Sequence, residues 1–258
     1  MLKETSMRNF EAIEAQTPYD VEARVQTFHW WFVVRRKLLR SILSSLDLPH
    51  GCLAVDVGCG AGSNLTVLEF AGFNVIGLDR SFYALSLAQK KQKFPLLNGD
   101  VNNLPIRGGS IGLIVAMDIL EHLDNDTTSI RTFYEALKEE GTLILTVPAF
   151  KFLWGIQDEV TGHKRRYSRR EVVNKLQEAG FRVIKSSYFN FLLFFPILIV
   201  RRMIYLLGVK IESENEVNLP LINFVLKTIF SFEAYILKYL SFPFGVSVLC
   251  IAKKMRLE

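Results

Sequence analysis

Cysteine is scarce in this sequence, with three residues in 258, and it forms no recognisable pattern. Cys52, Cys59 and Cys250 show neither CxxC spacing nor an even number, which argues against a disulfide framework and against a cysteine zinc site. We therefore expect reduced thiols in a cytoplasmic protein, and the sequence suggests no metal site.

An excess of one charge sign and a long uninterrupted apolar run are also missing. A net charge of +5 is too small to identify a nucleic-acid binder, so we expect no nucleic-acid partner. Residues 1–20 mix charged and apolar residues, unlike a signal peptide. The most hydrophobic stretch, residues 189–209, is split by Arg201 and Arg202 into pieces shorter than the roughly 17 to 25 residues of a membrane-spanning helix. We therefore expect neither export nor a transmembrane helix.

From residue 53 onward, short strand patterns alternate with helical patterns, the order that builds a parallel sheet with helices on both faces. The predicted strands are residues 53–57, 74–78, a short one near 96, 110–116, 142–147, 181–187 and 246–252. The predicted helices are residues 21–46, 63–71, 81–91, 127–139 and 168–179. The sequence thus predicts an α/β fold with a Rossmann-like, doubly wound, seven-stranded and mostly parallel sheet.

The chain is expected to have four parts. They are an N-terminal helical segment (1–50), the Rossmann-like core (51–188), a hydrophobic helical insertion (189–244) and the final strand of the sheet (245–258).

A glycine-rich turn follows the first predicted strand. Gly58, Gly60 and Gly62 let the backbone pass close to a ligand at the start of a helix. The dinucleotide fingerprint GxGxxG would need glycine where Ser63 stands, and the acidic Asp56 inside the turn suits a cationic amino group. The spacing disfavours NAD, although an NAD-dependent oxidoreductase remains an alternative.

Acidic residues also follow the next strands. Asp79 comes at the end of the second strand, about where a ribose diol would be held, and Asp100 follows the third. Asp118, Glu121 and His122 follow the fourth. Open α/β sheets bind ligands at the carboxyl ends of their strands, so we expect these residues to surround one ligand.

Through the glycine turn and residues 118–123, the chain resembles the class I S-adenosylmethionine-dependent methyltransferase superfamily over roughly residues 51–147. The resemblance implies S-adenosylmethionine as cofactor and methyl transfer as the reaction. The cofactor-binding residues that it implies are Asp56, Gly58, Gly60, Gly62, Asp79, Arg80, Asp100, Val101, Met117 and Asp118. In this analogy, Asp56 and Gly58 face the methionine part and Asp79 the ribose. Asp100 and Val101 contact the adenine, and Met117 and Asp118 line the reaction side.

The segment after the fifth strand carries candidates for acceptor chemistry. Methyl transfer mainly requires orientation of donor and acceptor, and it needs a base only if the acceptor must lose a proton. The base candidates are His163, His122, Asp158 and Tyr167, with a structural hydrogen-bonding role as the alternative for the histidines. The candidates for acceptor binding are Trp154, Arg165 and Arg166, whose guanidinium groups suit a phosphate or carboxylate or else a solvated helix start. This segment and the insertion resemble a bacterial and archaeal subgroup of type 11/12-like methyltransferases.

The insertion holds far more apolar residues than one amphipathic stripe needs. A helical cap, a homodimer interface or a bilayer would each cover them, the last with Arg201, Arg202 and Lys210 at headgroup level. We therefore expect a small-molecule or lipid-linked acceptor, with peripheral contact at the inner face of the membrane as one alternative for residues 189–244. A membrane-associated binding protein with a degenerate methyltransferase fold is the remaining alternative function.

Overall fold

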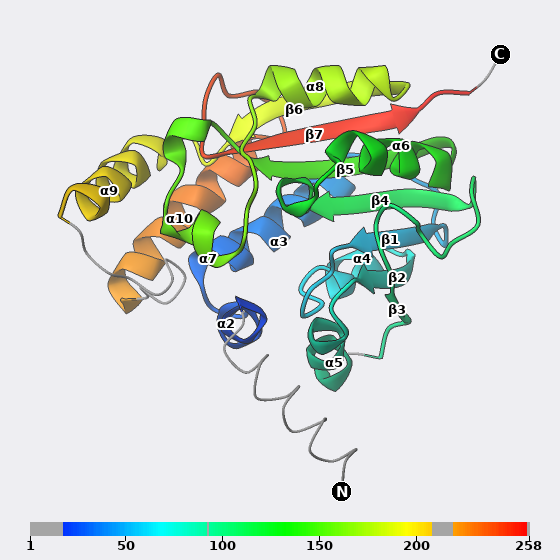
Figure 1. Ribbon diagram of the computed structural model, residues 1–258, viewed down its shortest axis with the longest axis horizontal. Coiled ribbons are helices and arrows are strands. Elements are labelled where there is room, and N and C mark those ends of the chain that lie inside the picture. Colours follow the sequence, from blue (N-terminus) through cyan, green and yellow to red (C-terminus); the bar gives the residue numbers. More distant parts are fainter. Residues whose placement is uncertain (1–17, 92, 208–218, 257–258) are drawn as a thin grey trace, which may run out of the picture.

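The computed structural model describes residues 18–91, 93–207 and 219–256. Its centre is a seven-stranded sheet with helices on both faces (Figure 1). The strand order is β3-β2-β1-β4-β5-β7-β6, and β7 runs antiparallel to both of its neighbours. The predicted Rossmann-like, mostly parallel α/β fold is confirmed.

Each predicted strand is found near its expected position. The strands are β1 (Leu53–Val57), β2 (Asn74–Asp79), β3 (Leu96–Asn98), β4 (Ile111–Met117), β5 (Leu137–Pro148), β6 (Phe181–Phe189) and β7 (Ser247–Lys254). All residues of β4 are buried, as expected for a strand covered on both faces of a parallel sheet. The continuous apolar runs of the sequence therefore mark the centre of the sheet.

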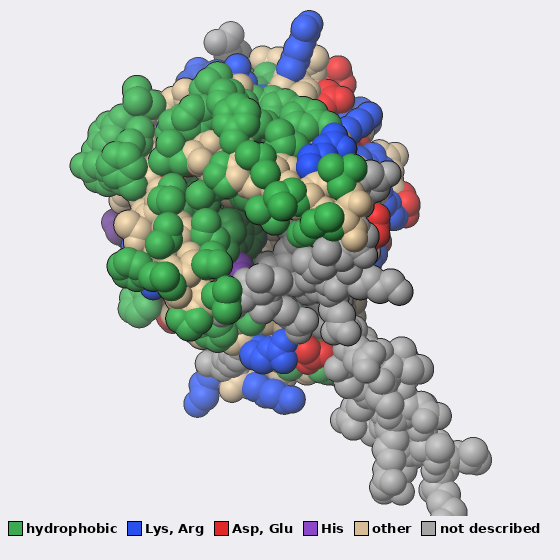
Figure 2. Space-filling view, turned by 90° about the vertical axis from the view of Figure 1, so that its left-hand side faces the viewer, with side chains coloured by type: hydrophobic (Ala, Val, Ile, Leu, Met, Phe, Trp, Pro, Cys, Tyr) green, Lys and Arg blue, Asp and Glu red, His purple; other side chains and the backbone are tan. Residues whose placement is uncertain are grey.

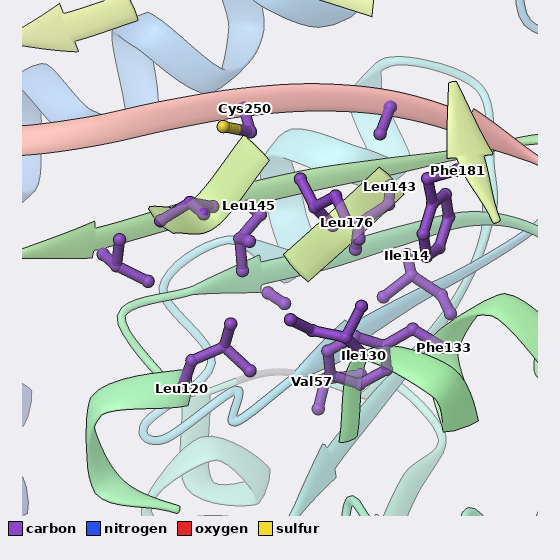
Figure 3. Packing of buried hydrophobic residues seen from close by; sticks show 14 of the residues in the cluster. Val57, Ile114, Leu120, Ile130, Phe133, Leu143, Leu145, Leu176, Phe181 and Cys250 are labelled. Carbon is purple, nitrogen blue, oxygen red and sulfur yellow. The ribbon is translucent and has the colours of Figure 1, made fainter. Parts of the chain in front are cut away.

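Two hydrophobic layers enclose the sheet. On one face, α6 (Asp126–Ala136) and α8 (Arg169–Glu178) bury Ile130, Phe133 and Leu176 against Ile114 and Leu143 of the sheet (Figure 3). The other face is covered by α3 (Trp30–Leu43), α4 (Leu65–Phe70) and α10 (Pro220–Ile236). The remaining helices of the core are α5 (Phe82–Lys91), η1 (Leu120–His122), η2 (Lys151–Leu153) and α7 (Ile156–Val160).

The helix predicted over residues 127–139 ends earlier than expected. α6 stops at Ala136, and Leu137 already pairs with Ile111 of β4 as the first residue of β5. Leu137 is fully buried, so strand pairing and burial outweigh the helical propensity of the residues that follow it. The prediction was wrong because that pairing partner is distant in the sequence.

The single helix predicted over residues 21–46 was also wrong. The structure has α2 (Pro18–Val25) and then α3, separated by residues 26–29, with His29 in an extended conformation. The backbone N–H of Trp30 donates to Oδ1 of Asn223 on α10 at 2.6 Å, which holds the start of α3 in place. The break lets α2 turn away from α3, and Asp20 on α2 accepts a hydrogen bond from the hydroxyl of Tyr83 on α5 at 2.5 Å.

The insertion lies between β6 and β7, which pair directly at Phe189 and Ser247. It contains α9 (Phe194–Leu207) and α10, which lie beyond the carboxyl ends of β4 and β5 (Figure 1). α10 packs along α3, where Phe230 stacks on Trp31 at 5.7 Å between ring centroids. Among the described helices, none combines the length and apolarity that crossing a membrane requires. Lys210 lies outside the described residues.

Candidate functional site

A pocket of about 990 Å³ opens at the carboxyl ends of β1, β2 and β4. Its lining includes the glycine turn and Asp79 together with apolar residues of α9 and α10. The sequence motifs and the hydrophobic insertion therefore share one cavity.

The glycine turn is tied to the second strand. The N–H groups of Gly58 and Cys59 both donate to the carbonyl of Leu78, at 2.8 and 3.0 Å. Gly58 has φ +70°, and a Cβ there would come within 2.7 Å of the Ile119 side chain, so the close approach requires glycine. The helix predicted from residue 63 begins at Leu65, because residues 59–62 close a separate turn before it.

Asp79 stands at the centre of this cradle. One carboxylate oxygen accepts the N–H of Gly60 and the other the N–H of Ser81, each at 2.9 Å. The side chain is buried and lines the pocket, and burial raises its pKa against these hydrogen bonds. Each oxygen keeps a second acceptor position, so the carboxylate can hold the turn and a ligand diol together.

Asp56 lies beneath the turn and is fully buried. Burial raises its pKa to about 7, although Asn64 donates to Oδ1 at 3.3 Å. Oδ2 has no hydrogen-bond partner among the described residues. A buried carboxylate oxygen without a partner, next to a ligand-sized pocket, fits a cationic amino group.

Asp56 itself is not part of the described lining of the pocket, but several of the other candidates are. Arg80, Asp100, Val101 and Met117 all border it, whereas Gly62 is buried behind the turn. Asp100 is exposed, and its Oδ1 accepts the N–H of Asn102 at 2.8 Å. A flat ligand would therefore meet an exposed carboxylate beside the apolar Val101.

Asp118 borders the pocket directly after the end of β4. It has φ 57°, accepts the Thr146 hydroxyl at 3.0 Å and forms an ion pair with Arg35 of α3 at 2.9 Å. Arg35 also lies over the ring of Trp31, 5.4 Å from its centroid. The sequence showed Arg35 only as one of several basic residues in a helix, and it gave no signal for this ion pair.

Asp158 organises the loop that holds His163 against the pocket. It is fully buried and accepts two hydrogen bonds from Arg166, at 2.8 and 2.9 Å, and one from the N–H of Gly155 at 2.8 Å. Nδ1 of His163 lies 2.7 Å from its Oδ1. Burial would raise the pKa of Asp158, but the hydrogen bonds from His163 and Arg166 outweigh it and hold the pKa well below its usual value. This carboxylate is committed to its partners, which favours a positioning role over that of a base.

His122 and Glu121 complete the wall beside His163. The rings of His122 and His163 meet edge to face, 4.7 Å apart. Burial, followed by the neighbouring His163, lowers the pKa of His122 to about 4. Glu121 is fully buried and also borders the pocket.

Comparison with known proteins connects this geometry to a family. Residues 55–145, which span the glycine turn, Asp79 and Asp118, match the model of a family described as "Methyltransferase domain". Residues 55–145 therefore form a methyltransferase domain. Its fold agrees with that of the class I superfamily of S-adenosylmethionine-dependent methyltransferases, to which the domain is similar.

Relatives share this methyltransferase domain at low identity. A probable S-adenosylmethionine-dependent methyltransferase of Mycolicibacterium smegmatis is 26% identical over 144 residues, covering 53% of this chain and 55% of that protein. The ubiquinone biosynthesis O-methyltransferase of Rattus norvegicus is 25% identical over 156 residues, covering 54% and 45%. The chain spans about half the length of these curated relatives. A chain from the solved Haloferax volcanii complex of a methyltransferase with the Trm112 methyltransferase activator has the same fold, with a TM-score of 0.63 at 18% identity, covering 93% of this chain and 99% of that one.

Four of the predicted base and acceptor-binding residues are not part of the described lining of the pocket: Trp154, Asp158, Arg165 and Tyr167. The Tyr167 hydroxyl is buried and donates to Asp126 at 2.8 Å, and burial raises its pKa. Arg165 donates to the carbonyl of Asp124 at 3.0 Å. Arg166 borders the pocket, but its guanidinium group is bound to Asp158 and to the carbonyl of Ala149. Both arginines therefore donate hydrogen bonds to carboxylate or carbonyl oxygens of their own chain.

Asn190 is a pocket residue that sequence reasoning missed. It follows β6 with φ 59° and is fully buried at the border of the pocket. Neither its Nδ2 nor its Oδ1 has a hydrogen-bond partner among the described residues. No motif marks this position, because its place in the pocket of the methyltransferase domain depends on the path of the insertion.

The insertion supplies the apolar end of the pocket. Its residues there are Ile197, Val200 and Ile204 of α9 and Ile222 and Leu226 of α10. Arg201 also borders the pocket and donates to the carbonyl of Leu153 at 2.5 Å, whereas Arg202 is exposed.

The outer surfaces of α9 and α10 expose large apolar side chains, and hydrophobic residues cover much of this face of the molecule (Figure 2). They include Phe195, Ile199, Met203 and Leu206 of α9 and Leu221, Phe224, Phe232 and Tyr235 of α10. The insertion is therefore a cap on its inner side and an uncovered apolar surface on its outer side.

Proposed function

We propose that this protein transfers the methyl group of S-adenosylmethionine to a lipid-linked acceptor. The observation that carries the proposal is the single pocket that joins the glycine turn and Asp79 to the apolar wall of α9 and α10. A pocket with a polar end and an apolar end suits two ligands of different character that meet between them.

The donor end is assigned to residues of the chain as follows. Bound S-adenosylmethionine supplies a methyl group on a positively charged sulfur, which makes the methyl carbon electrophilic. Asp79 would accept hydrogen bonds from the ribose hydroxyls, and Asp56, together with the turn at Gly58, would bind the amino group. Asp100 and Val101 hold the adenine. Met117 and Asp118 line the side on which the methyl group is exposed.

The acceptor end is assigned to the insertion. Apolar chains of a lipid-linked acceptor lie along α9 and α10, and the polar group to be methylated reaches Asn190 and His163. The residues then act mainly by orientation, because an in-line displacement needs the acceptor atom aligned with the methyl carbon. The acceptor atom forms a bond to the methyl carbon as the carbon–sulfur bond breaks, and any proton on that atom is released to solvent.

The uncovered face of α9 and α10 gives such an acceptor a route from a bilayer. Interfacial helices place apolar side chains below the headgroups and basic residues among them, and Arg202 is exposed beside the apolar residues of α9. In this proposal the protein is cytoplasmic and contacts the inner face of the membrane peripherally. A homodimer through the same face is the alternative occupant of this surface.

The test is transfer of tritiated methyl from S-adenosylmethionine into vesicles made from a total lipid extract. We expect label in the organic phase with the wild type. The double variant Met203→Lys, Leu206→Lys should lose vesicle flotation and most of the transfer while keeping its affinity for S-adenosylhomocysteine, because both side chains are exposed on α9.

Phe70→Lys is the control, since Phe70 is as exposed as Leu206 but lies on α4. Label that stays in the aqueous phase would contradict a lipid-linked acceptor. If the wild type is a dimer that does not float with vesicles, and the double variant is a monomer, the apolar face binds a second copy of the chain and not a membrane.

Binding of S-adenosylhomocysteine should depend on the ionisation of Asp56. Burial raises the pKa of Asp56 to about 7, so the carboxyl group is protonated in the free protein below that pH. Among its neighbours, Asn64 and Arg35 lower this pKa, and the carboxylates of Glu22 and Asp79 raise it. The ligand ammonium group needs the carboxylate, so affinity should rise about tenfold from pH 6 to pH 8. Calorimetric titration measures this slope, and Asp56→Asn should flatten it. A flat profile in the wild type would show that Asp56 does not meet the ammonium group.

A further inference from the structure

Three side chains of metal-ligand type converge beside the pocket. One oxygen of Glu121 and one nitrogen each of His122 and His163 all lie within 4.8 Å of one another, and all three residues border the cavity. Nε2 of His163 is 3.9 Å from Oε1 of Glu121. Ligand atoms about 2.0 to 2.2 Å from one tetrahedral ion lie roughly 3.3 to 3.6 Å apart, so the three side chains must draw together by up to about 1.5 Å to close the site. We propose that these residues bind a divalent transition-metal ion.

Glu121 is the strongest indication of a cation. It is completely buried, and neither carboxylate oxygen has a hydrogen-bond partner in another described residue. Asp118 is a neighbouring carboxylate, and the nearby cations Arg35 and Arg166 pair with Asp118 at 2.9 Å and with Asp158 at 2.8 Å. A buried carboxylate in such surroundings is costly unless a positive ion meets it. A metal ion between Glu121 and the two histidines supplies that charge.

The two histidines are held in the orientation that metal ligands need. Nδ1 of His163 faces the carboxylate of Asp158 at 2.7 Å, and Arg166 fixes that carboxylate from the other side. This arrangement places the proton on Nδ1 and turns the lone pair of Nε2 toward Glu121, as carboxylate–histidine pairs do around metals. The backbone of Gly162 makes a hydrogen bond with His122. Both rings are therefore supported by a second set of contacts.

The donor set indicates the class of ion and its use. Two imidazole nitrogens and one carboxylate oxygen suit Zn²⁺, Mn²⁺ or Fe²⁺ better than Mg²⁺ or Ca²⁺, which prefer oxygen ligands. Three protein ligands would leave coordination positions open, and all three residues border the pocket. An oxygen atom of the acceptor would fill one of them, which makes hydroxyl- or carboxylate-bearing acceptors the substrate class. This last step rests on the proposed methyl transfer, whereas metal binding itself does not.

The test is titration of the untagged, metal-free, full-length protein with Co²⁺, followed by its visible absorption, with Zn²⁺ as competitor. We expect Glu121→Gln and His163→Gln each to weaken Co²⁺ binding at least about tenfold. His50→Gln should bind like the wild type, because His50 is exposed and precedes the amino end of β1, whereas the pocket lies at the carboxyl end. Zn²⁺ should raise the melting temperature of the wild type but not of Glu121→Gln, which should be at least as stable as the wild type without metal, since it loses only an unpartnered buried charge.

Two results would overturn the metal site: no Co²⁺ absorption in the wild type, or absorption that survives in both Glu121→Gln and His163→Gln. S-adenosylhomocysteine is titrated into the same samples as a separate measure. Binding of Co²⁺ without binding of S-adenosylhomocysteine would support the metal site and contradict the proposed function. Binding of S-adenosylhomocysteine without binding of Co²⁺ would support the proposed function and contradict the metal site.

Discussion

Asp79→Ala should weaken the binding of S-adenosylhomocysteine by about 1 to 3 kcal/mol, which is roughly a 5- to 150-fold rise in Kd. The substitution removes the acceptor for the ribose hydroxyls. It also leaves the N–H groups of Gly60 and Ser81 without the carboxylate that holds the turn against β2. Calorimetric titration at pH 8 gives the affinity, and circular dichroism verifies the fold.

Asp100→Ala is the matched control for this result. Asp100 borders the same pocket but is exposed, so water replaces much of what its carboxylate contributes and the loss should be smaller. If a folded Asp79→Ala variant binds S-adenosylhomocysteine as tightly as the wild type, Asp79 does not bind the ribose. That result would contradict the proposed placement of the donor.

Asp158→Ala should lower the free energy of unfolding by about 3 to 5 kcal/mol. The substitution leaves the guanidinium group of Arg166 buried without its carboxylate, and breaking one half of a buried ion pair has this cost. Urea denaturation followed by tryptophan fluorescence measures the change. The variant should also lose the orientation of His163, because its Nδ1 partner is gone.

Two further variants separate this loss from a general effect of removing charge. Asp124→Ala removes an exposed carboxylate that pairs with Lys164 at the surface, and we expect no measurable change in stability. The double variant Asp158→Leu, Arg166→Met should recover part of the loss, since apolar side chains replace both buried charges. A loss below about 1 kcal/mol in Asp158→Ala would show that the pair is solvated rather than structural.

Local sequence was sufficient for the sheet and for the position of the glycine turn after its first strand. β1 was predicted at its observed bounds because a short apolar run ends directly at the glycine turn. Asp79 was predicted at the end of the second strand because the strand pattern of residues 74–78 stops there, and β2 does end at Asp79. Such features depend on residues within one turn or strand, so neighbouring positions in the sequence carry the information.

Features set by distant partners could not be predicted in this way. The break between α2 and α3 depends on a hydrogen bond from Trp30 to Asn223, 193 positions away. The early start of β5 at Leu137 depends on β4, and the ion pair between Arg35 and Asp118 joins a helix to a strand end. The basic cluster was visible in the sequence, but the carboxylate that binds Arg166 was not, because the loop must fold before the two residues meet.

The attachment of the insertion to the sheet has a further consequence. Its two ends leave and rejoin the fold at Phe189 and Ser247, which are direct partners in adjacent strands. A module whose ends already touch can be exchanged for a longer or shorter one at little entropic cost to the rest of the chain. Because α10 also packs along α3, an exchange would have to keep that contact, and α9 is the part that could vary in length. In the proposed reaction, such a change would alter the apolar wall of the pocket while the glycine turn and Asp79 stay in place.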